Sequence, residues 1–345
     1  MASSTSSSRK GRSVAAYLAA FAVAFAFTAL VIAALVASGL PHGSFAPPTR
    51  LPGREDAFFI YAGDDDLGHR VLWHGFGTSI EHARAADIVI VGDSRSQLGL
   101  REAGIEEFSR STGNSVFHMG LGYGEQSWLP MKLIERHDLR PRVVIIAVSS
   151  RFFLGNPSRW ASTVTSESRW DAWKGIAEKT LQWHVARVLH RVVPRYDATA
   201  QTLWGSFVFY RSHRTGSWIP VIEPDTSTPV RLVPRRQQVF EGQLEAAIEL
   251  KEMLGRRGTR IVLTVIPNSR ANYAHAEFLA SALDVPLIAP RLSGLGVVDG
   301  VHLDAVSARR FSEAFWSEFA EAPAVRDLLA GSGRPERIVG YSQRR

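Results

Sequence analysis

Three residues of this 345-residue chain have the types and the order needed for nucleophilic catalysis. Ser94 follows a short apolar run, so its hydroxyl lies at a strand-to-turn junction, where backbone N–H groups can face a developing oxyanion. A serine is a weak nucleophile unless a base lies next to it. His302 supplies such a base, and Asp299, three residues earlier, is placed to fix its tautomer and stabilise the imidazolium. The order Ser, Asp, His is compatible with a catalytic triad.

The same residues also have ordinary structural interpretations. Gly92-Asp93-Ser94 is common turn chemistry after a buried strand. Asp299 and His302 precede Asp304 and Ser307, which are residue types that cap a helix. The order of the three residues and their positions after strands favour the catalytic interpretation.

Strand and helix patterns alternate around these residues. Apolar runs typical of buried parallel strands occupy Asp87–Val91, Ser115–Met119, Arg142–Val148 and Arg260–Ile266, with a weaker one at Pro286–Ile288. Helical patterns occupy Leu100–Arg110, Ser127–His137, Gln237–Arg257, Ala271–Leu283 and Ser307–Glu321. Residues 54–86 are expected to be irregular. The alternation predicts an α/β fold, with a parallel sheet covered by helices on both faces.

Ligands of open α/β sheets bind beyond the carboxyl ends of the strands. The residues that follow the predicted strands are therefore the candidates for a site. They are Gly92–Ser96, the glycine-rich turn Gly120–Gly124, Ser149–Arg151 and Asp299–His302.

The N-terminus predicts a membrane anchor and an exported body. Val14–Leu40 carries no charge, and about 20 apolar residues suffice to span a bilayer. Arg9, Lys10 and Arg12 precede it, so the positive-inside rule places residues 1–13 in the cytoplasm and the body outside, in the periplasm or the extracellular space. A cleaved signal peptide is the alternative, but its apolar region spans only about 7–15 residues. The expected organisation is an anchor at 14–40, a proline-rich linker at 41–53, a body at 54–330 and a basic tail at 331–345.

Composition excludes several classes of function. The formal net charge of +7 comes from the two ends, which leaves residues 51–330 close to neutral and makes nucleic acid an unexpected partner. The chain has no cysteine, so it has no disulfide, thiolate zinc site, iron–sulfur cluster or cysteine nucleophile. The Gly120–Gly124 turn lacks the spacing of a dinucleotide loop, and no cofactor is expected. His69, His74 and His82, near Asp64–Asp66, match no known pattern of metal ligands, so no metal is expected either.

Residues 151–235 interrupt the alternation and are expected to form an insertion. This segment contains six tryptophans, which suit core or lid packing or a sugar-binding platform. Leu181–Val193 has apolar residues at helical spacing, typical of a docked lid helix or of a helix lying on the membrane.

The motifs together resemble the SGNH/GDSL hydrolase superfamily. The resemblance is carried by IVIVGDSRS, the glycine turn after the second strand and DGVHLD, and it covers about residues 87–150 and 237–320. It implies a flavodoxin-like three-layer α/β/α fold, with Ser94 as the nucleophile and Asp299 and His302 as acid and base. It also implies that a backbone N–H of the glycine turn, best matched by Gly122, binds the oxyanion together with the N–H of Ser94. Gly120 and Gly124 are the other matches.

Two positions depart from the family pattern. Arg95 stands where the family usually has leucine, and a cation beside the nucleophile suits an anionic glycan. The third block lacks the asparagine that completes the oxyanion hole, because the chain reads Ala147-Val148-Ser149-Ser150. Losing one such donor typically costs about 10²–10³ in kcat. Ser149 or Ser150 is left as the substitute donor.

A membrane-anchored domain of this kind also resembles proteins that add or remove O-acetyl groups on cell-envelope polysaccharides. Such proteins often work beside a multipass membrane acyltransferase. We therefore expect an acyl-ester hydrolase or O-acyltransferase that acts on an envelope glycan. The alternatives are a non-catalytic binding or assembly subunit of a glycan-modifying complex, and an esterase for small or lipid esters.

Overall fold

The computed structural model describes eight ranges of the chain, which are residues 16–28, 30, 54–61, 67–122, 125–178, 209–220, 227–231 and 242–330. The chain divides into two compact units, Met1–Pro48 and Thr49–Arg345. The predicted cytoplasmic segment 1–13, linker 41–53, helix 181–193 and basic tail 331–345 lie outside the described residues.

The first unit contains a helix within the predicted membrane span. Residues 16–28 and 30 are helical, and their side chains, including Phe21 and Phe25, are exposed. The rest of the range 14–40 lies outside the described residues. Where the chain is described, no helix has both the length and the apolar character needed to cross a membrane. The predicted span therefore has no support from this part of the structure.

A four-stranded parallel sheet forms the centre of the second unit, as predicted. Its strands are β2 (Ile88–Val91), β3 (Val116–His118), β4 (Val143–Ala147) and β8 (Arg260–Thr264). They lie in the order β3-β2-β4-β8, and every neighbouring pair is parallel. The weak strand expected at Pro286–Ile288 is reduced to one parallel bridge between Leu263 and Leu287.

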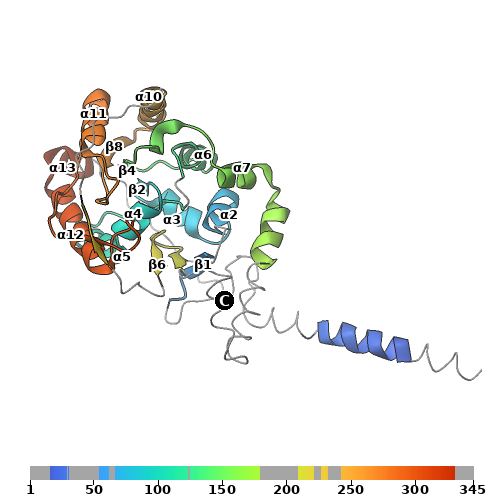
Figure 1. Cartoon of the computed structure of the whole chain (residues 1–345). Helices are drawn as coiled ribbons and strands as arrows, with labels where there is room; N and C mark the ends of the chain where they lie inside the picture. Colours follow the sequence, from blue (N-terminus) through green and yellow to red (C-terminus); the bar gives the residue numbers. More distant parts are fainter. Residues whose placement is uncertain are drawn as a thin grey trace, which may run out of the picture. The chain divides into compact units, whose positions relative to one another are not determined.

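Helices pack on both faces of this sheet (Figure 1), because its strands are apolar on both sides. Ile88 and Ile90 of β2 face a core with Phe108 and Phe315, which belong to α5 (Glu102–Thr112) and α12 (Ala305–Glu321). Val89 and Val91 face a second core. Its helices are α6 (Trp128–Arg136), α10 (Gln243–Gly255) and α11 (Tyr273–Leu283). Another helix, α13 (Pro323–Ala330), follows α12.

The described parts of the range 54–86, which are residues 54–61 and 67–86, contain regular elements, which corrects the prediction of an irregular segment. They form β1 (Ala57–Tyr61), α2 (Leu67–His74) and α3 (Ser79–Ala85). The strand β1 pairs antiparallel with β5 (Phe209–Ser212), which pairs with β6 (Trp218–Pro220). The run Ala57–Tyr61 is rich in strand-favouring residues, but its partner lies far along the chain, so the sequence alone does not indicate the pairing.

The predicted insertion 151–235 is joined to the body at several places. It begins with the short helix η1 (Phe152–Leu154) and α7 (Arg159–Ser166), and residues 169–178 are also helical. It then supplies β5 and β6 to the antiparallel sheet. Further along, β7 (Thr228–Pro229) pairs with β9 (Gly296–Val297), just before the predicted acid and base. The described parts of the insertion are therefore structural elements of the second unit.

Candidate active site

The turn after β2 places Ser94 at the first position of a short helix, α4 (Ser94–Gly99). Asp93 is the N-cap, and its carboxylate accepts a hydrogen bond of 3.0 Å from the Arg95 N–H. The Arg95 guanidinium also pairs with this carboxylate. As the first residue of α4, Ser94 has an N–H with no acceptor inside the helix. The turn therefore presents the Ser94 hydroxyl together with a backbone donor.

Gly92 allows this turn to pack tightly against the neighbouring strand. A Cβ atom at position 92 would lie 2.6 Å from the Ser96 Oγ and 2.9 Å from the Ala147 Cβ, closer than side chains approach. Any larger residue would push α4 away from the end of β4. Close packing therefore explains why residue 92 is a glycine, whether or not Ser94 is catalytic.

Ser94, His302 and Asp299 lie in one hydrogen-bonded chain. The Ser94 Oγ is 2.9 Å from the His302 Nε2, and the His302 Nδ1 is 2.6 Å from the Asp299 Oδ2. When the Nδ1–H donates to Asp299, Nε2 is left as the acceptor for the Ser94 hydroxyl. The three residues predicted from the sequence are therefore brought together in the geometry of a nucleophile, a base and the group that orients the base.

Asp299 is held as a carboxylate by its own loop. Its Oδ1 accepts hydrogen bonds from the N–H groups of Val301 at 3.1 Å and His302 at 2.8 Å. Burial favours the protonated acid, but the hydrogen bonds from the ring and N–H of His302 outweigh burial and hold the pKa of Asp299 well below its ordinary value. Asp304 has the separate role of capping α12, where it accepts from the Ser307 N–H at 2.7 Å. The cap and the site residues are thus different residues.

The glycine turn after β3 lies against the turn after β2, Gly92–Ser96. This second turn carries the candidate nucleophile Ser94 and is called the nucleophile turn below. The Leu121 N–H donates to the Gly92 carbonyl oxygen at 3.0 Å, and Gly122 follows as a buried residue. Gly120 packs closely against the start of α4, because a Cβ at this position would lie 2.8 Å from the Ser96 Oγ. Gly124 lies outside the described residues. The structure therefore places Gly122 one residue beyond a direct contact with the nucleophile turn.

The side chain of Gln97 links α4 to segments that belong to both sheets. Its buried side-chain amide donates to the carbonyl oxygens of Gly120 at 2.8 Å and Gly216 at 3.2 Å. Its Oε1 accepts from the Trp218 N–H of β6 at 2.9 Å. Two segments that are distant in sequence, the turn after β3 and the stretch from Gly216 to Trp218, are therefore fixed to the helix that begins with Ser94.

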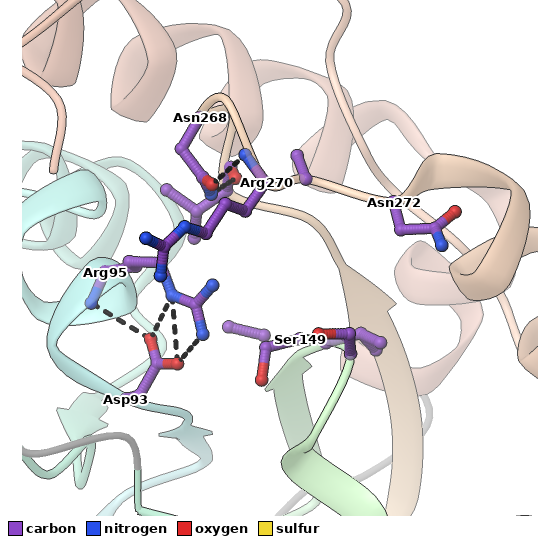
Figure 2. Close-up of a pocket in the computed structure, with 11 residues that line it drawn as sticks. Asp93, Arg95, Ser149, Asn268, Arg270 and Asn272 are labelled. Carbon is purple, nitrogen blue, oxygen red and sulfur yellow. Dashed lines mark hydrogen bonds and ion pairs between the residues drawn. The ribbon is translucent and has the colours of Figure 1, made fainter. Parts of the chain in front are cut away.

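A small polar pocket adjoins the nucleophile turn (Figure 2). Asp93 and Arg95 line it from the end of β2, and Ser149 and Ser150 line it from the end of β4. The loop after β8 completes it with three residues that were not predicted from the sequence, namely Asn268, Arg270 and Asn272. The rule that sites lie at the carboxyl ends of strands applies to β8 as well, and would have found this loop.

Ser149, predicted as the substitute oxyanion donor, lies in this pocket. It shares the pocket with Asp93 and Arg95, the two neighbours of Ser94 in the chain. No hydrogen bond joins the Ser149 hydroxyl to Ser94 or His302 in the described structure. Its role as a donor to the oxyanion stays a prediction.

The three histidines between residues 69 and 82 are mostly buried. His69 and His74 lie on α2 and are buried, and His82 on α3 is half-buried. His69 Nε2 lies 3.1 Å from the buried carboxylate of Glu125. Asp64–Asp66 lie outside the described residues, among which no group of three or more potential ligands is placed to hold a metal ion.

Comparison of the chain with protein-family models, with curated proteins and with solved structures finds no match.

Proposed function

We propose that this protein is a serine-dependent acyl-ester hydrolase or O-acyltransferase. The observation that carries the proposal is the continuous hydrogen-bonded chain from the Ser94 Oγ through His302 to Asp299. The strand order, in which the first parallel strand lies between the second and the third, is that of flavodoxin-like sheets and supports the resemblance to SGNH/GDSL hydrolases.

The proposed reaction has two halves. The Ser94 Oγ attacks the acyl carbonyl carbon while the His302 Nε2 takes the hydroxyl proton, and the Ser94 N–H stabilises the oxyanion with help from Gly122 or Ser149. The intermediate expels the alcohol, which takes the proton from His302, and leaves an acyl-serine. Water or a sugar hydroxyl then attacks this ester and gives its proton to His302. As the bond between the acyl carbon and the Ser94 Oγ breaks, His302 returns a proton to the Oγ. Water yields the free acid, whereas a sugar yields a new ester, and either restores Ser94.

An envelope glycan is the proposed acceptor or substrate. This part of the proposal is supported by the resemblance to envelope O-acetylation proteins and by the charge-free N-terminal stretch that predicts a membrane anchor. A multipass membrane acyltransferase as a partner protein belongs to the same proposal.

Labelling with a fluorophosphonate probe tests the acyl chemistry. The purified full chain should be labelled, and the Ser94→Ala and His302→Ala variants should not, because the probe reacts only with an activated serine. Ser162→Ala is the matched control, since Ser162 is an exposed serine on α7 and should leave labelling unchanged. Absence of labelling in a folded wild-type sample would contradict the proposal and favour the non-catalytic binding subunit.

A second comparison separates the two enzymatic alternatives. Purified wild-type protein is given short synthetic esters with and without an O-acetylated glycan as competitor. Competition by the glycan supports a glycan enzyme. Turnover that the glycan leaves unchanged supports an esterase for small or lipid esters.

A further inference from the structure

The polar pocket beside Ser94 carries more cationic than anionic groups. Arg95 and Arg270 both line it and extend their guanidinium groups into it (Figure 2). Among the described residues that line it, Asp93 is the only acid. The pocket therefore has an excess of one positive charge.

The two arginines differ in how their charge is balanced. The Arg95 guanidinium is paired with the Asp93 carboxylate, whose side chain is only 5% exposed. Arg270 is exposed, and its backbone N–H is occupied by the Asn268 Oδ1 at 2.8 Å. Its guanidinium makes no hydrogen bond or ion pair with any residue in the described ranges. Arg270 thus offers a planar set of donors to an anion that enters the pocket.

The other residues that line the pocket are polar, apart from the apolar Ala147, Val148, Ile266 and Ala271. The Asn268 side chain is buried and is held by its Nδ2–H, which donates to the Ile266 carbonyl oxygen at 2.9 Å. Ser149 and Ser150 supply hydroxyl groups on the opposite wall. Such a lining provides neutral donors around a cationic centre, which suits a small oxyanion better than an apolar acyl chain.

The pocket borders the candidate site on two sides. Asp93 and Arg95 flank Ser94 in the chain, so one wall is the nucleophile turn itself. The other wall is the loop after β8, in which Ser269, between Asn268 and Arg270, donates to the Gly300 carbonyl oxygen at 2.5 Å. Gly300 lies between Asp299 and His302. A group bound in the pocket would therefore lie beside the turn that carries Ser94.

We propose that Arg95 and Arg270 form a subsite for a carboxylate of the substrate. The excess charge of one matches a monoanion, and the planar fork of Arg270 matches the geometry of a carboxylate. The inference rests on the proposed function and adds to it the substrate class, an ester in which one partner carries a carboxylate. The carboxylate belongs either to the sugar, as in a uronic acid, or to the acyl group, as in a half-ester of a dicarboxylic acid.

Binding to the full chain carrying Ser94→Ala tests the subsite without requiring turnover. Isothermal titration calorimetry is run with glucuronate against glucose for the sugar arm, and with succinate monoamide against succinamide for the acyl arm. We expect the charged member of at least one pair to bind about tenfold or more tightly, as expected for a hydrogen bond to a charged group. The arm that shows the preference identifies the source of the carboxylate.

Arginine variants tie the preference to the pocket. Added to Ser94→Ala, Arg270→Gln should remove the preference, and Arg270→Lys should keep part of it. Arg326→Gln, which removes an exposed arginine of α13, should leave it unchanged. Equal affinity for charged and neutral molecules in both arms would overturn the proposal, as would a preference that survives Arg270→Gln. Because Arg270 is exposed, its replacement should not impair folding, and thermal unfolding of each variant checks this.

The failure of this proposal and that of the acyl chemistry are distinguishable. If wild-type protein resists the fluorophosphonate while the Ser94→Ala chain binds carboxylates through Arg270, the subsite stands and the acyl chemistry fails. If the probe labels Ser94 and neither arm shows a charge preference, the acyl chemistry stands and the subsite fails.

Discussion

The hydroxyl of Ser269 donates a hydrogen bond of 2.5 Å to the carbonyl oxygen of Gly300, and so joins the loop after β8 to the loop that carries Asp299 and His302. The acid and base lie on a loop that is otherwise held mainly by its own hydrogen bonds, such as that from the Val298 N–H to the His302 carbonyl oxygen at 2.9 Å. Ser269 therefore has the position of a residue that, in the proposed reaction, orients Asp299 and His302 without touching the substrate.

Replacing Ser269 with alanine should slow the reaction without unfolding the protein. Loss of one neutral hydrogen bond is worth about 1 kcal/mol, which corresponds to a loss of about fivefold in kcat. KM should change little, and Ser269→Thr, which retains a hydroxyl, should restore most of kcat. Ester turnover gives both constants, and urea unfolding checks stability. An unchanged kcat in Ser269→Ala would show that the contact does not orient His302.

Replacing Asp299 with asparagine should abolish most activity while the loop remains formed. The asparagine Oδ1 can still accept the N–H groups of Val301 and His302, but its amide no longer accepts from the Nδ1–H of His302. The imidazole then favours the wrong tautomer, and kcat is expected to fall about 10³–10⁴-fold. The rate of fluorophosphonate labelling measures this. Asp304→Asn is the matched control, because asparagine is also a good helix cap and labelling should persist.

Stability should fall as the pH is lowered below about 6.5, because several histidines are buried in the neutral form. Burial lowers the pKa of His118 to about 3, and it lowers the pKa values of His74 and His213 to about 4. Between pH 6.5 and pH 4 the unfolded chain therefore binds more protons than the folded chain, so acid favours unfolding.

Urea unfolding at a series of pH values measures this proton uptake. The midpoint should decrease steadily from pH 6.5 to pH 4, and His213→Gln should reduce the proton uptake on unfolding by about one. A midpoint that is constant between pH 7 and pH 5 would rule out buried neutral histidines.

Two glycine replacements separate backbone strain from steric overlap. Gly113 and Gly216 both have positive φ angles, of 73° and 68°, so alanine at either position costs about 1–2 kcal/mol in strain. A Cβ at Gly113 meets nothing within 4 Å, whereas one at Gly216 would lie 2.4 Å from the carbonyl oxygen of His118. Chemical unfolding should therefore show a clearly larger loss of stability in Gly216→Ala than in Gly113→Ala. Equal losses would contradict the close packing of β3 against the turn before β6.

The parallel sheet was predictable from the sequence because the evidence for it is local. The run Ile88–Val91 is apolar throughout, as is the other central strand, β4, and strands buried on both faces require this pattern. The helix α12 likewise has a capping aspartate and an apolar stripe, so its start was predicted within two residues. The positions of Ser94, Asp299 and His302 after strands followed from the same elements.

The pairing of the antiparallel sheet and the contacts of Gln97 are not encoded by any local pattern. The run Ala57–Tyr61 is rich in strand-favouring residues, but its partner β5 lies far along the chain. The loop with Arg270 follows β8 and could have been found by the carboxyl-end rule, but its neighbours in the pocket depend on the pairing of β8 with β4. Gln97, a buried polar residue, has no sequence signal at all, since its partners come from two distant segments. Contacts between segments so far apart in the chain become apparent only in the folded structure.

The side chain of Gln97 has a consequence for how the protein responds to heat. One side-chain amide joins α4 to the turn after β3 and to the stretch from Gly216 to Trp218, which leads into β6. The helix that begins with Ser94 should therefore loosen only when those segments separate as well. Inactivation and melting should therefore be a single cooperative event, with no temperature range in which the second unit is folded and Ser94 is displaced.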